Sequence, residues 1–399
     1  MTDYQYLIIG GGMTAHGAIR GIRSEDPTGS IGLISSESHP PYKRPPLSKG
    51  LWQGKSIEKI WYKDEELNVS MHLGRTVQKL MLENKQVIDD EGNLYHFDKL
   101  LLATGGAPVR LPFGGEDIIY FRDLDDYQKL RSLSEEKQHF AVIGGGFIGS
   151  EIAAALAMNG KQVTMLFPEE GIGARLFPPD LSQFLNNYYQ EKGVEVLSEK
   201  LVTGVARQGE RLSLNVRSAA DEGSKEEIVG IDAVVAGIGI WPNVHLAEQA
   251  GLSVDDGIAV DELLRSGNPD IYAAGDVSNF YNPSLNARIR LEHEDNALTM
   301  GKYAGRNMAG KEDFYHHLPY FYSDLFDLGY EAVGLTDSRL ETVADWVEPY
   351  KKGVVYYMQD GRVRGVLLWN VWERVDAARD LIAQPGPIDI KGLKGKFLS

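Results

Sequence analysis

The stretch AVIGGGFIGSEIAAALAMNGKQVTMLFPEEG, residues Ala141–Gly171, decides the fold. A short apolar strand leads into a glycine-rich turn, a helix follows, and a second apolar strand ends in acid. The glycines permit a tight turn and let a pyrophosphate approach the backbone, while the helix offers unpaired N–H groups at its N-terminus. The stretch therefore predicts a dinucleotide-binding strand–helix–strand unit.

The spacing of the glycines and the acid indicates which dinucleotide is bound. The loop follows the pattern G-x-G-x-x-G and comprises Gly144, Gly146, Phe147, Ile148 and Gly149. Glu169 ends the next strand, about 25 residues on, where an acid accepts hydrogen bonds from ribose hydroxyls. A carboxylate there repels the extra phosphate of NADPH, so we expect a preference for NADH. Arg175 lies close by, so we expect that preference to be incomplete.

The N-terminal residues Tyr6–Glu37, YLIIGGGMTAHGAIRGIRSEDPTGSIGLISSE, repeat the same pattern more loosely. Gly10 and Gly12 are present, but Ala15 stands at the third glycine position. The acid nearest the expected place is Glu37. One such motif is weak evidence, whereas two copies, each followed by its second strand, predict two nucleotide sites in one chain.

Composition restricts the remaining possibilities. The chain has 399 residues, 43% of them hydrophobic, which suits a globular protein of two or three domains. A net charge of -16 argues against general nucleic-acid binding and against docking on an anionic membrane. No apolar run approaches the roughly 20 residues of a membrane span. The first strand begins almost at the N-terminus, so we expect no targeting peptide and a cytoplasmic protein.

The remaining pattern predicts how the chain is organised. Residues Thr76–Phe97 and Leu201–Ile228 alternate apolar and polar side chains around turns and predict two antiparallel meanders. Ala233–Ile240, AVVAGIGI, predicts one strand that closes the second unit. From about Leu318, alternating strands precede a helix over Arg374–Ile382. The predicted class is α/β, with two nested Rossmann-like dinucleotide-binding domains and a C-terminal α+β domain with an antiparallel sheet.

Several motifs together resemble the two-dinucleotide flavoproteins of the glutathione reductase structural class. The motifs are ATGG at 103–106, GIGIWPN at 237–243 and YAAGD at 272–276, beside the two glycine-rich loops. The segments PPYKRPPLSK, RLEHEDNAL, FYSDL and GVLLWNVWERVDAARDLI are similar to the apoptosis-inducing factor and ferredoxin reductase branch, and FPEEG with RLFPPDLS most resembles apoptosis-inducing factor. The resemblance covers nearly the whole chain and implies a bacterial-type member.

This resemblance implies two cofactors and a division of the chain. FAD is expected to stay bound at the first loop and NADH to bind transiently at the second, where its hydride passes to flavin N5. The implied domains are residues 1–115 with 240–315 for FAD, 116–239 for NADH and 316–399 for the C-terminal domain. Asp276 of YAAGD is expected to hold the ribityl chain of FAD.

The resemblance also implies further contact residues. Lys49 is expected beside flavin N5, with Glu151 as its partner, where the two can tune the electronics of the flavin. Other implied FAD contacts are Arg44, Thr104, Gly105, Arg122 and Tyr322. Phe147 is expected to gate the nicotinamide pocket, and Gly239, Glu292 and His293 to line it. No metal site is predicted.

Two positions depart from the pattern of the branch. Tyr322 stands where many relatives are expected to carry tryptophan, so stacking and oxygen access near the flavin should differ. Ser36 stands where the branch usually has an acid, which leaves Glu37 as the substitute ribose ligand.

The chain contains no cysteine, and this limits the reaction that follows flavin reduction. Disulfide relays and single-cysteine mechanisms are excluded, so electrons must pass directly to an external acceptor. The first hypothesis is a reductase that feeds a small redox protein such as a ferredoxin or rubredoxin. The alternatives are a slow redox-sensing protein that forms a flavin–NAD charge-transfer complex, and a monodehydroascorbate- or quinone-type reductase. A homodimer stays open as an assembly.

Overall fold

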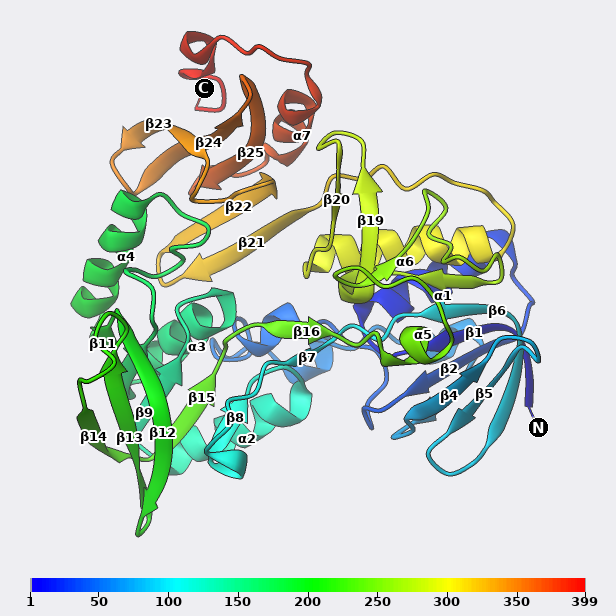
Figure 1. Cartoon of the computed structure of the whole chain (residues 1–399), viewed down its shortest axis with the longest axis horizontal. Helices are drawn as coiled ribbons and strands as arrows, with labels where there is room; N and C mark the ends of the chain where they lie inside the picture. Colours follow the sequence, from blue (N-terminus) through cyan, green and yellow to red (C-terminus); the bar gives the residue numbers. More distant parts are fainter. Residues whose placement is uncertain (1, 399) are drawn as a thin grey trace. The chain divides into compact units, whose positions relative to one another are not determined.

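The computed structural model describes residues 2–398, which form two compact units built from separate segments (Figure 1). The first unit comprises the chain up to Arg44, Ser56–Ala107 and Trp241–Phe321. The second comprises Pro45–Lys55, Pro108–Ile240 and the chain from Tyr322 onward. The two nucleotide-binding motifs therefore lie in different units.

A seven-stranded sheet forms the centre of the first unit, in the order β3–β2–β1–β6–β5–β4, with β18 also paired to β6. Its strands are β1 (Thr2–Ile9), β2 (Ile31–Ser35), β3 (Val69–Leu73), β4 (Val77–Met81), β5 (Gln86–Asp89), β6 (Leu94–Leu102) and β18 (Ile271–Ala273). The strands β1, β2, β3, β6 and β18 pair in parallel, whereas β4, β5 and β6 form the antiparallel meander predicted for Thr76–Phe97.

The register of this sheet gathers four motifs at one edge. Ile9 at the end of β1 pairs with Ile34 on β2 and with Leu102 on β6, and Leu102 pairs with Ala273 on β18. Because ligands of open parallel sheets bind beyond the carboxyl ends of the strands, this edge is where a cofactor is expected. The residues that follow these strands include the first glycine-rich loop, Glu37, ATGG and Asp276.

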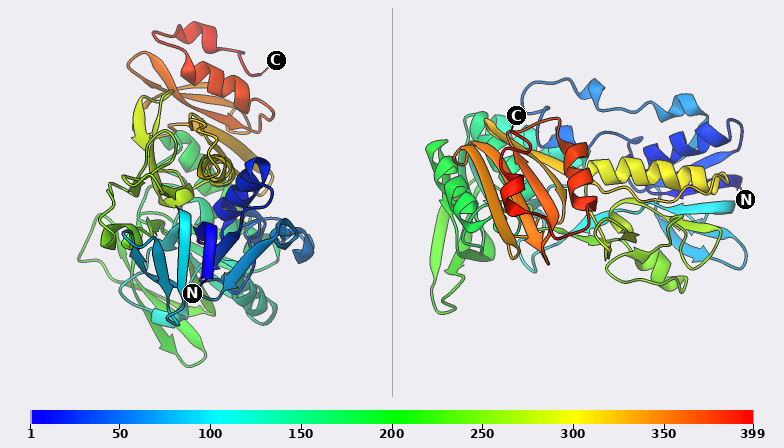
Figure 2. Two further views of the ribbon diagram at one scale, coloured as in Figure 1. Left: turned by 90° about the vertical axis from the view of Figure 1, so that its right-hand side faces the viewer. Right: turned by 90° about the horizontal axis from the view of Figure 1, so that it is seen from above.

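Helices α1 (Met13–Glu25) and α6 (Glu294–Met308) lie side by side in this unit, as Figure 2 shows. Glycines on both helices allow the close approach. A Cβ atom on Gly17 would lie 2.4 Å from the carbonyl of Leu298, and one on Gly301 would lie 2.2 Å from that of Thr14. The pairing fixes the start of α1, and with it the first glycine-rich loop, against the rest of the unit.

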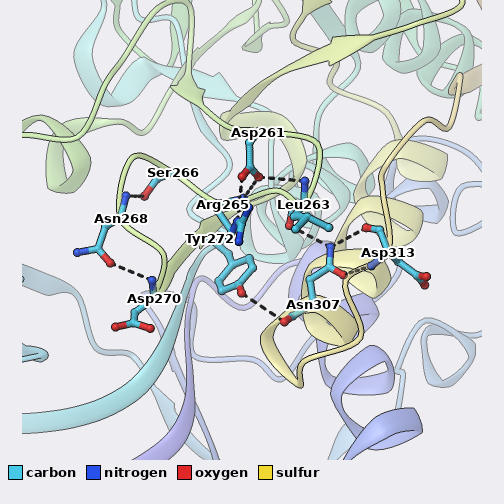
Figure 3. A network of polar contacts seen from close by, with 9 residues as sticks. All are labelled: Asp261, Leu263, Arg265, Ser266, Asn268, Asp270, Tyr272, Asn307 and Asp313. Atoms are coloured by element: carbon cyan, nitrogen blue, oxygen red, sulfur yellow. Dashed lines mark hydrogen bonds and ion pairs between the residues drawn. The ribbon is translucent and has the colours of Figure 1, made fainter.

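A polar network secures β18 near the far end of α6 (Figure 3). The Tyr272 hydroxyl donates to the Asn307 carbonyl at 3.2 Å, and the Asn307 amide donates to the Leu263 carbonyl at 3.0 Å. The same amide also donates to the Asp313 carbonyl at 2.8 Å. These bonds hold the strand that leads directly into Asp276. The other elements of the unit are α5 (His245–Gln249), β17 (Ile258–Ala259), β19 (Ser278–Asn282) and β20 (Ala287–Ile289).

The second unit contains a five-stranded sheet in the order β11–β10–β9–β15–β8, whose pairs are all parallel. Its strands are β8 (Ile118–Tyr120), β9 (His139–Ile143), β10 (Gln162–Leu166), β11 (Val194–Leu197) and β15 (Ala233–Ala236). The helices are α2 (Leu124–Glu136), α3 (Phe147–Met158) and α4 (Pro179–Glu191). Strands β12 (Lys200–Gln208), β13 (Arg211–Ser218) and β14 (Glu226–Ile231) form the second predicted meander.

The prediction of one continuous strand over Ala233–Ile240 is wrong. The structure has β15 at Ala233–Ala236 and a separate strand β16 at Ile240–Pro242, while β7 lies at Gly106–Pro108. The chain leaves the sheet at Gly237, whose carbonyl would lie 2.3 Å from a Cβ atom on Gly144, and Gly239 adopts φ +103°. The close approach to the glycine-rich loop and the left-handed conformation of Gly239 end the strand.

The C-terminal part of the second unit is an antiparallel sheet in the order β21–β22–β25–β24–β23, with α7 (Val375–Ala383) packed on it (Figure 2). The strands are β21 (Tyr320–Leu325), β22 (Leu328–Gly334), β23 (Glu341–Glu348), β24 (Lys352–Gln359) and β25 (Arg362–Trp369). The fully buried Trp369 stacks on Tyr330 with ring centroids 5.6 Å apart, and Phe177 meets both rings edge-on. The predicted fold class is confirmed.

No helix within residues 2–398 is both long enough and apolar enough to cross a membrane.

Candidate functional site

The first glycine-rich loop has the geometry that a pyrophosphate requires. Gly10 adopts φ +110°, and a Cβ atom there would lie 2.1 Å from the Ala103 carbonyl oxygen, so only glycine fits the turn. Gly12 is the N-cap of α1, and its position carries no side-chain hydrogen bond to the helix N–H groups. Ala15, at the third motif position, is fully buried. Because no side chain caps α1 and Gly12 carries none, the start of this helix leaves room for an anion.

An arginine and three oxygen-bearing side chains lie beside this loop. Arg44 pairs with the Glu37 carboxylate, and its Nη2 would lie 3.9 Å from a Cβ atom on Gly12. The Tyr42 hydroxyl also donates to Glu37, at 2.6 Å. Burial disfavours the charged guanidinium, but the charges of neighbours that include Glu37 and Asp276 outweigh burial and raise the pKa of Arg44. Glu37, Arg44 and Asp276 therefore share one electrostatic environment.

ATGG joins the same edge of the sheet. The Thr104 hydroxyl donates to the Asn243 carbonyl at 2.8 Å, and the Asn243 N–H donates to the Gly105 carbonyl at 2.9 Å. Gly105 adopts φ +61°. These bonds fix the turn after β6, next to the first glycine-rich loop.

The second glycine-rich loop repeats this construction in the other unit. Gly144 adopts φ +116°, and a Cβ atom on Gly149 would lie 2.0 Å from the Gly144 carbonyl oxygen. Gly146 is the N-cap of α3 and faces open space on its Cβ side. The side chain of Ile148 packs within 3.2 Å of where a Cβ atom on Gly237 would lie. Phe147 is 38% exposed at the first turn of the helix, and its gating role stays a prediction.

Glu169 and Arg175 form an ion pair beyond the end of β10. The Arg175 Nε and Nη2 atoms donate to the Glu169 Oε1 atom at 3.1 and 2.8 Å. Arg175 is 88% exposed in its side chain, whereas Glu169 is 27% exposed. The loop between them is fixed because the Gly173 N–H donates to the Gly145 carbonyl at 2.8 Å. Carboxylate and guanidinium thus stand together where the ribose of a dinucleotide is expected.

Lys49 and Glu151 meet within the second unit. Lys49 Nζ lies 2.5 Å from Glu151 Oε1, with side-chain exposures of 13% and 4%. The proline-rich segment that carries Lys49 folds with this unit, although the residues on either side belong to the first unit. The sequence prediction did not name two further ligands of the carboxylate, Ser48 and Ser323, which donate at 2.5 and 2.6 Å. Ser48 precedes the predicted Lys49, and Ser323 follows the predicted Tyr322. This adjacency is the sequence signal that could have pointed to both serines.

The remaining predicted residues of the second unit lie at three places. Tyr322 presents its ring to Lys49, whose Nζ lies 5.2 Å from the ring centroid. The Gly239 carbonyl accepts from the Val109 N–H at 2.9 Å. Arg122 lies just before α2, and its backbone N–H donates to the Asp126 carboxylate at 2.9 Å. The structure thus brings Tyr322 to the Lys49–Glu151 pair and places Arg122 in the second unit.

Glu292 and His293 belong to the first unit, immediately before α6. The Glu292 carboxylate accepts from Arg290 at 2.7 Å. His293 is the N-cap residue of α6 and stacks on Phe321 with ring centroids 4.2 Å apart. Burial lowers the pKa of His293 to about 4, against the opposing charges of Asp276 and Asp295. His293 is therefore neutral at neutral pH.

A pH dependence of stability follows from His293. Its folded-state pKa of about 4 lies below the ordinary 6.5, so the unfolded chain binds more protons between these values. The free energy of unfolding is therefore expected to fall as the pH drops from 6.5 to 4, with a slope of up to about one proton per molecule. Urea unfolding of wild type and His293→Gln across this range measures the slope, which should be shallower in the variant. The exposed His245→Gln is the control, and an equal slope in His293→Gln contradicts the assignment.

Comparison with known proteins identifies the family. A family model of the pyridine nucleotide-disulphide oxidoreductases matches residues 4–301. The chain belongs to this family. Residues 304–349 and 345–384 match a second model, the C-terminal domain of mitochondrion-associated apoptosis-inducing factor. The chain is an FAD-dependent NAD(P)H oxidoreductase, and FAD and NAD(H) are its cofactors.

Individual relatives of this oxidoreductase extend over most of its length. It is 35% identical to apoptosis-inducing factor 1, mitochondrial, of Dictyostelium discoideum, over 97% of this chain and 80% of the relative. It is 32% identical to the ferredoxin–NAD(+) reductase component of the anthranilate 1,2-dioxygenase system of Burkholderia cepacia, over 96% and 95%. A solved covalent complex of putidaredoxin reductase with putidaredoxin matches with a TM-score of 0.90 and 27% identity, over 99% of this chain and 97% of that one. The predicted resemblance is confirmed.

Proposed function

We propose that this oxidoreductase uses NADH to reduce a small iron–sulfur protein, such as a ferredoxin or rubredoxin, without any cysteine relay. The observation that carries the proposal is the buried Lys49–Glu151 ion pair in a chain with no cysteine. The Burkholderia relative is named a ferredoxin–NAD(+) reductase component, and the matched complex joins a reductase to putidaredoxin. Both names support an external protein acceptor for this chain.

Each glycine-rich loop binds a different dinucleotide, FAD at the first and NADH at the second. In the first unit, the start of α1 and Arg44 are the groups available to the phosphates of FAD, with Asp276 and Glu37 for its hydroxyls. In the second unit, the start of α3 binds the pyrophosphate of NADH, and Glu169 accepts from the adenosine ribose. FAD, when bound, supplies an acceptor for the hydride of NADH that releases the electrons singly.

The Lys49–Glu151 pair supplies a positive charge, the Lys49 ammonium, that is held in a fixed position. Hydride delivery adds negative charge to the acceptor, and an ammonium group held in place stabilises that charge without reorganisation of solvent. Glu151 keeps the ammonium in position at 2.5 Å, and the Tyr322 ring covers the same Nζ atom at 5.2 Å. We assign Lys49 the electrostatic role and Glu151 the role of holding it.

Anaerobic rapid mixing tests the proposal. The flavin-loaded protein is mixed with NADH, and then with a [2Fe–2S] ferredoxin, a rubredoxin, a quinone or oxygen in parallel. Reduction by NADH within milliseconds to seconds, followed by oxidation that is much faster with an iron–sulfur protein than with oxygen, is the expected result. Equal oxidation rates with all acceptors would contradict a protein acceptor, and faster oxidation by the quinone would favour the quinone-type alternative.

A second candidate function is favoured by the C-terminal match. Residues 304–384 resemble the C-terminal domain of apoptosis-inducing factor, which favours a slow-turnover protein that changes its assembly when NADH reduces it. The same rapid-mixing experiment separates the two functions, because a sensor stays reduced for minutes in the presence of an acceptor. Size-exclusion chromatography with and without NADH adds an independent readout, in which a shift to a dimer supports the sensor.

A further inference from the structure

The carboxylate of Glu151 is held by three donors from two parts of the second unit, the loop of Ser48 and Lys49 and the strand β21. Lys49 Nζ and the Ser323 hydroxyl both lie against Oε1, at 2.5 and 2.6 Å. The Ser48 hydroxyl donates to Oε2 at 2.5 Å. Lys49 and Ser48 come from the same loop, whereas Ser323 arrives on β21 from a point 172 residues beyond Glu151. The C-terminal sheet therefore contributes directly to the geometry of this ion pair.

Ser323 is well placed to fix the carboxylate. Its side chain is fully buried on a six-residue strand, and its neighbour Tyr322 presents its ring to Lys49. One strand therefore contacts both members of the pair, the carboxylate through Ser323 and the ammonium through Tyr322. A short hydroxyl on a paired strand has few rotamers, so it fixes an acceptor more firmly than a long side chain would.

A tyrosine contacts the serine in turn. The Tyr330 hydroxyl on β22 shares a hydrogen bond with Ser323. Burial, followed by the charge of Glu151, raises the pKa of Tyr330 well above its ordinary value, so this hydroxyl keeps its proton.

We propose that Ser323 is a positioning residue for hydride transfer, through which the C-terminal sheet sets the orientation of the Lys49–Glu151 pair. The inference rests on the proposed function, because it takes the charge of Lys49 to assist reduction. Loss of the hydroxyl leaves Glu151 Oε1 with Lys49 alone, so the carboxylate and the ammonium can rotate together away from their fixed geometry. The binding of NADH, which involves other residues, should not change.

The test compares Ser323→Ala, Glu151→Gln and the double variant, each as the flavin-loaded protein. Ser323→Ala should slow reduction at saturating NADH about tenfold, as expected for one lost charge-assisted hydrogen bond, with the KM for NADH nearly unchanged. The midpoint potential of the flavin should become more negative. Acetylation of the Lys49 amine, followed by mass spectrometry, should become faster because the amine is less firmly held. In the Glu151→Gln background, Ser323→Ala should have little further effect.

The matched control is Ser134→Ala. Ser134 is also buried in the same unit, but its hydroxyl donates to the Arg131 carbonyl at 2.7 Å, away from the ion pair. The inference is overturned if Ser323→Ala keeps the wild-type reduction rate, flavin potential and acetylation rate. It is also overturned if Ser134→Ala loses as much of the reduction rate as Ser323→Ala does. A third contradicting result is a full further loss of rate when Ser323→Ala is added to Glu151→Gln. If Glu151→Gln itself reduces at the wild-type rate, the role proposed for the ion pair fails. If Ser323→Ala is reduced at the wild-type rate but Glu151→Gln is slowed, only the role of Ser323 is rejected, and the role of the ion pair stands.

Discussion

Replacement of Lys49 by alanine is expected to slow reduction by NADH about a hundredfold while FAD stays bound, because a fixed charge that stabilises the developing anion is lost. The loop that carries Lys49 folds with Glu151, at a side-chain separation of 2.5 Å. The groups assigned to the FAD phosphates, Arg44 and the start of α1, belong to the first unit, whereas Lys49 folds with the second, so retention of the cofactor is expected. Stopped-flow absorbance at saturating NADH measures the rate, and the flavin-to-protein absorbance ratio measures occupancy.

The same substitution leaves a buried carboxylate without its cation, so stability also falls. Breaking a buried ion pair on one side costs roughly 3–5 kcal/mol in other proteins, and the Ser48 and Ser323 hydroxyls reduce that cost here. The double variant Lys49→Ala/Glu151→Gln removes both charges and should recover stability without recovering rate. Lys55→Ala, an exposed lysine at the end of the same segment, is the control. A wild-type reductive rate in Lys49→Ala would reject the electrostatic assignment.

Substitution of Glu169 by alanine is expected to raise the KM for NADH by about ten- to hundredfold, the cost of one or two charge-assisted hydrogen bonds to the ribose. The effect on NADPH should be much smaller and can be in the opposite direction. Glu169 now engages Arg175 at 2.8 Å, so its removal frees a guanidinium beside the place where the 2′-phosphate of NADPH would lie. Loss of the ribose contact weakens NADH binding, and release of Arg175 favours NADPH. Both effects shift the preference toward NADPH.

Steady-state kinetics with both nucleotides measures this change. Glu170→Ala removes an adjacent exposed carboxylate and controls for a general change of charge. The double variant Glu169→Ala/Arg175→Ala separates the two contributions, because it should weaken NADH binding without any gain for NADPH. Equal changes in KM for the two nucleotides in Glu169→Ala would show that this carboxylate does not bind the ribose.

Sequence reasoning worked where the signal is local. The glycine-rich loops, the second strands and both meanders each occupy about 30 residues or fewer, and their side-chain periods are fixed by backbone geometry. The strand predicted over Ala233–Ile240 failed because its end is set by a contact with Gly144, about ninety positions earlier. Isoleucines continue past the break, so the hydrophobic pattern does not mark it, and the signal is left to Gly237 and Gly239.

The environment of Glu37 shows a second limit. The sequence offered it as the substitute for the acid expected at Ser36, and that assignment stays a prediction. The structure adds that Arg44 and Tyr42 both hold its carboxylate. A hydrogen bond from Tyr42 depends on how the proline-rich loop returns to the sheet edge, and loop paths follow from tertiary packing.

By itself, the sequence determined that two dinucleotide sites lie in one chain and that this chain supplies no thiol, because a phosphate-binding turn is encoded by glycine spacing and composition is read directly. Only the tertiary structure decided which side chains surround the ion pair. Ser48, Glu151 and Ser323 are separated by 103 and 172 residues, and a buried carboxylate must satisfy its oxygens with whatever donors the fold delivers. The donors that satisfy the carboxylate are far apart in the sequence, so no helix or strand periodicity reveals them.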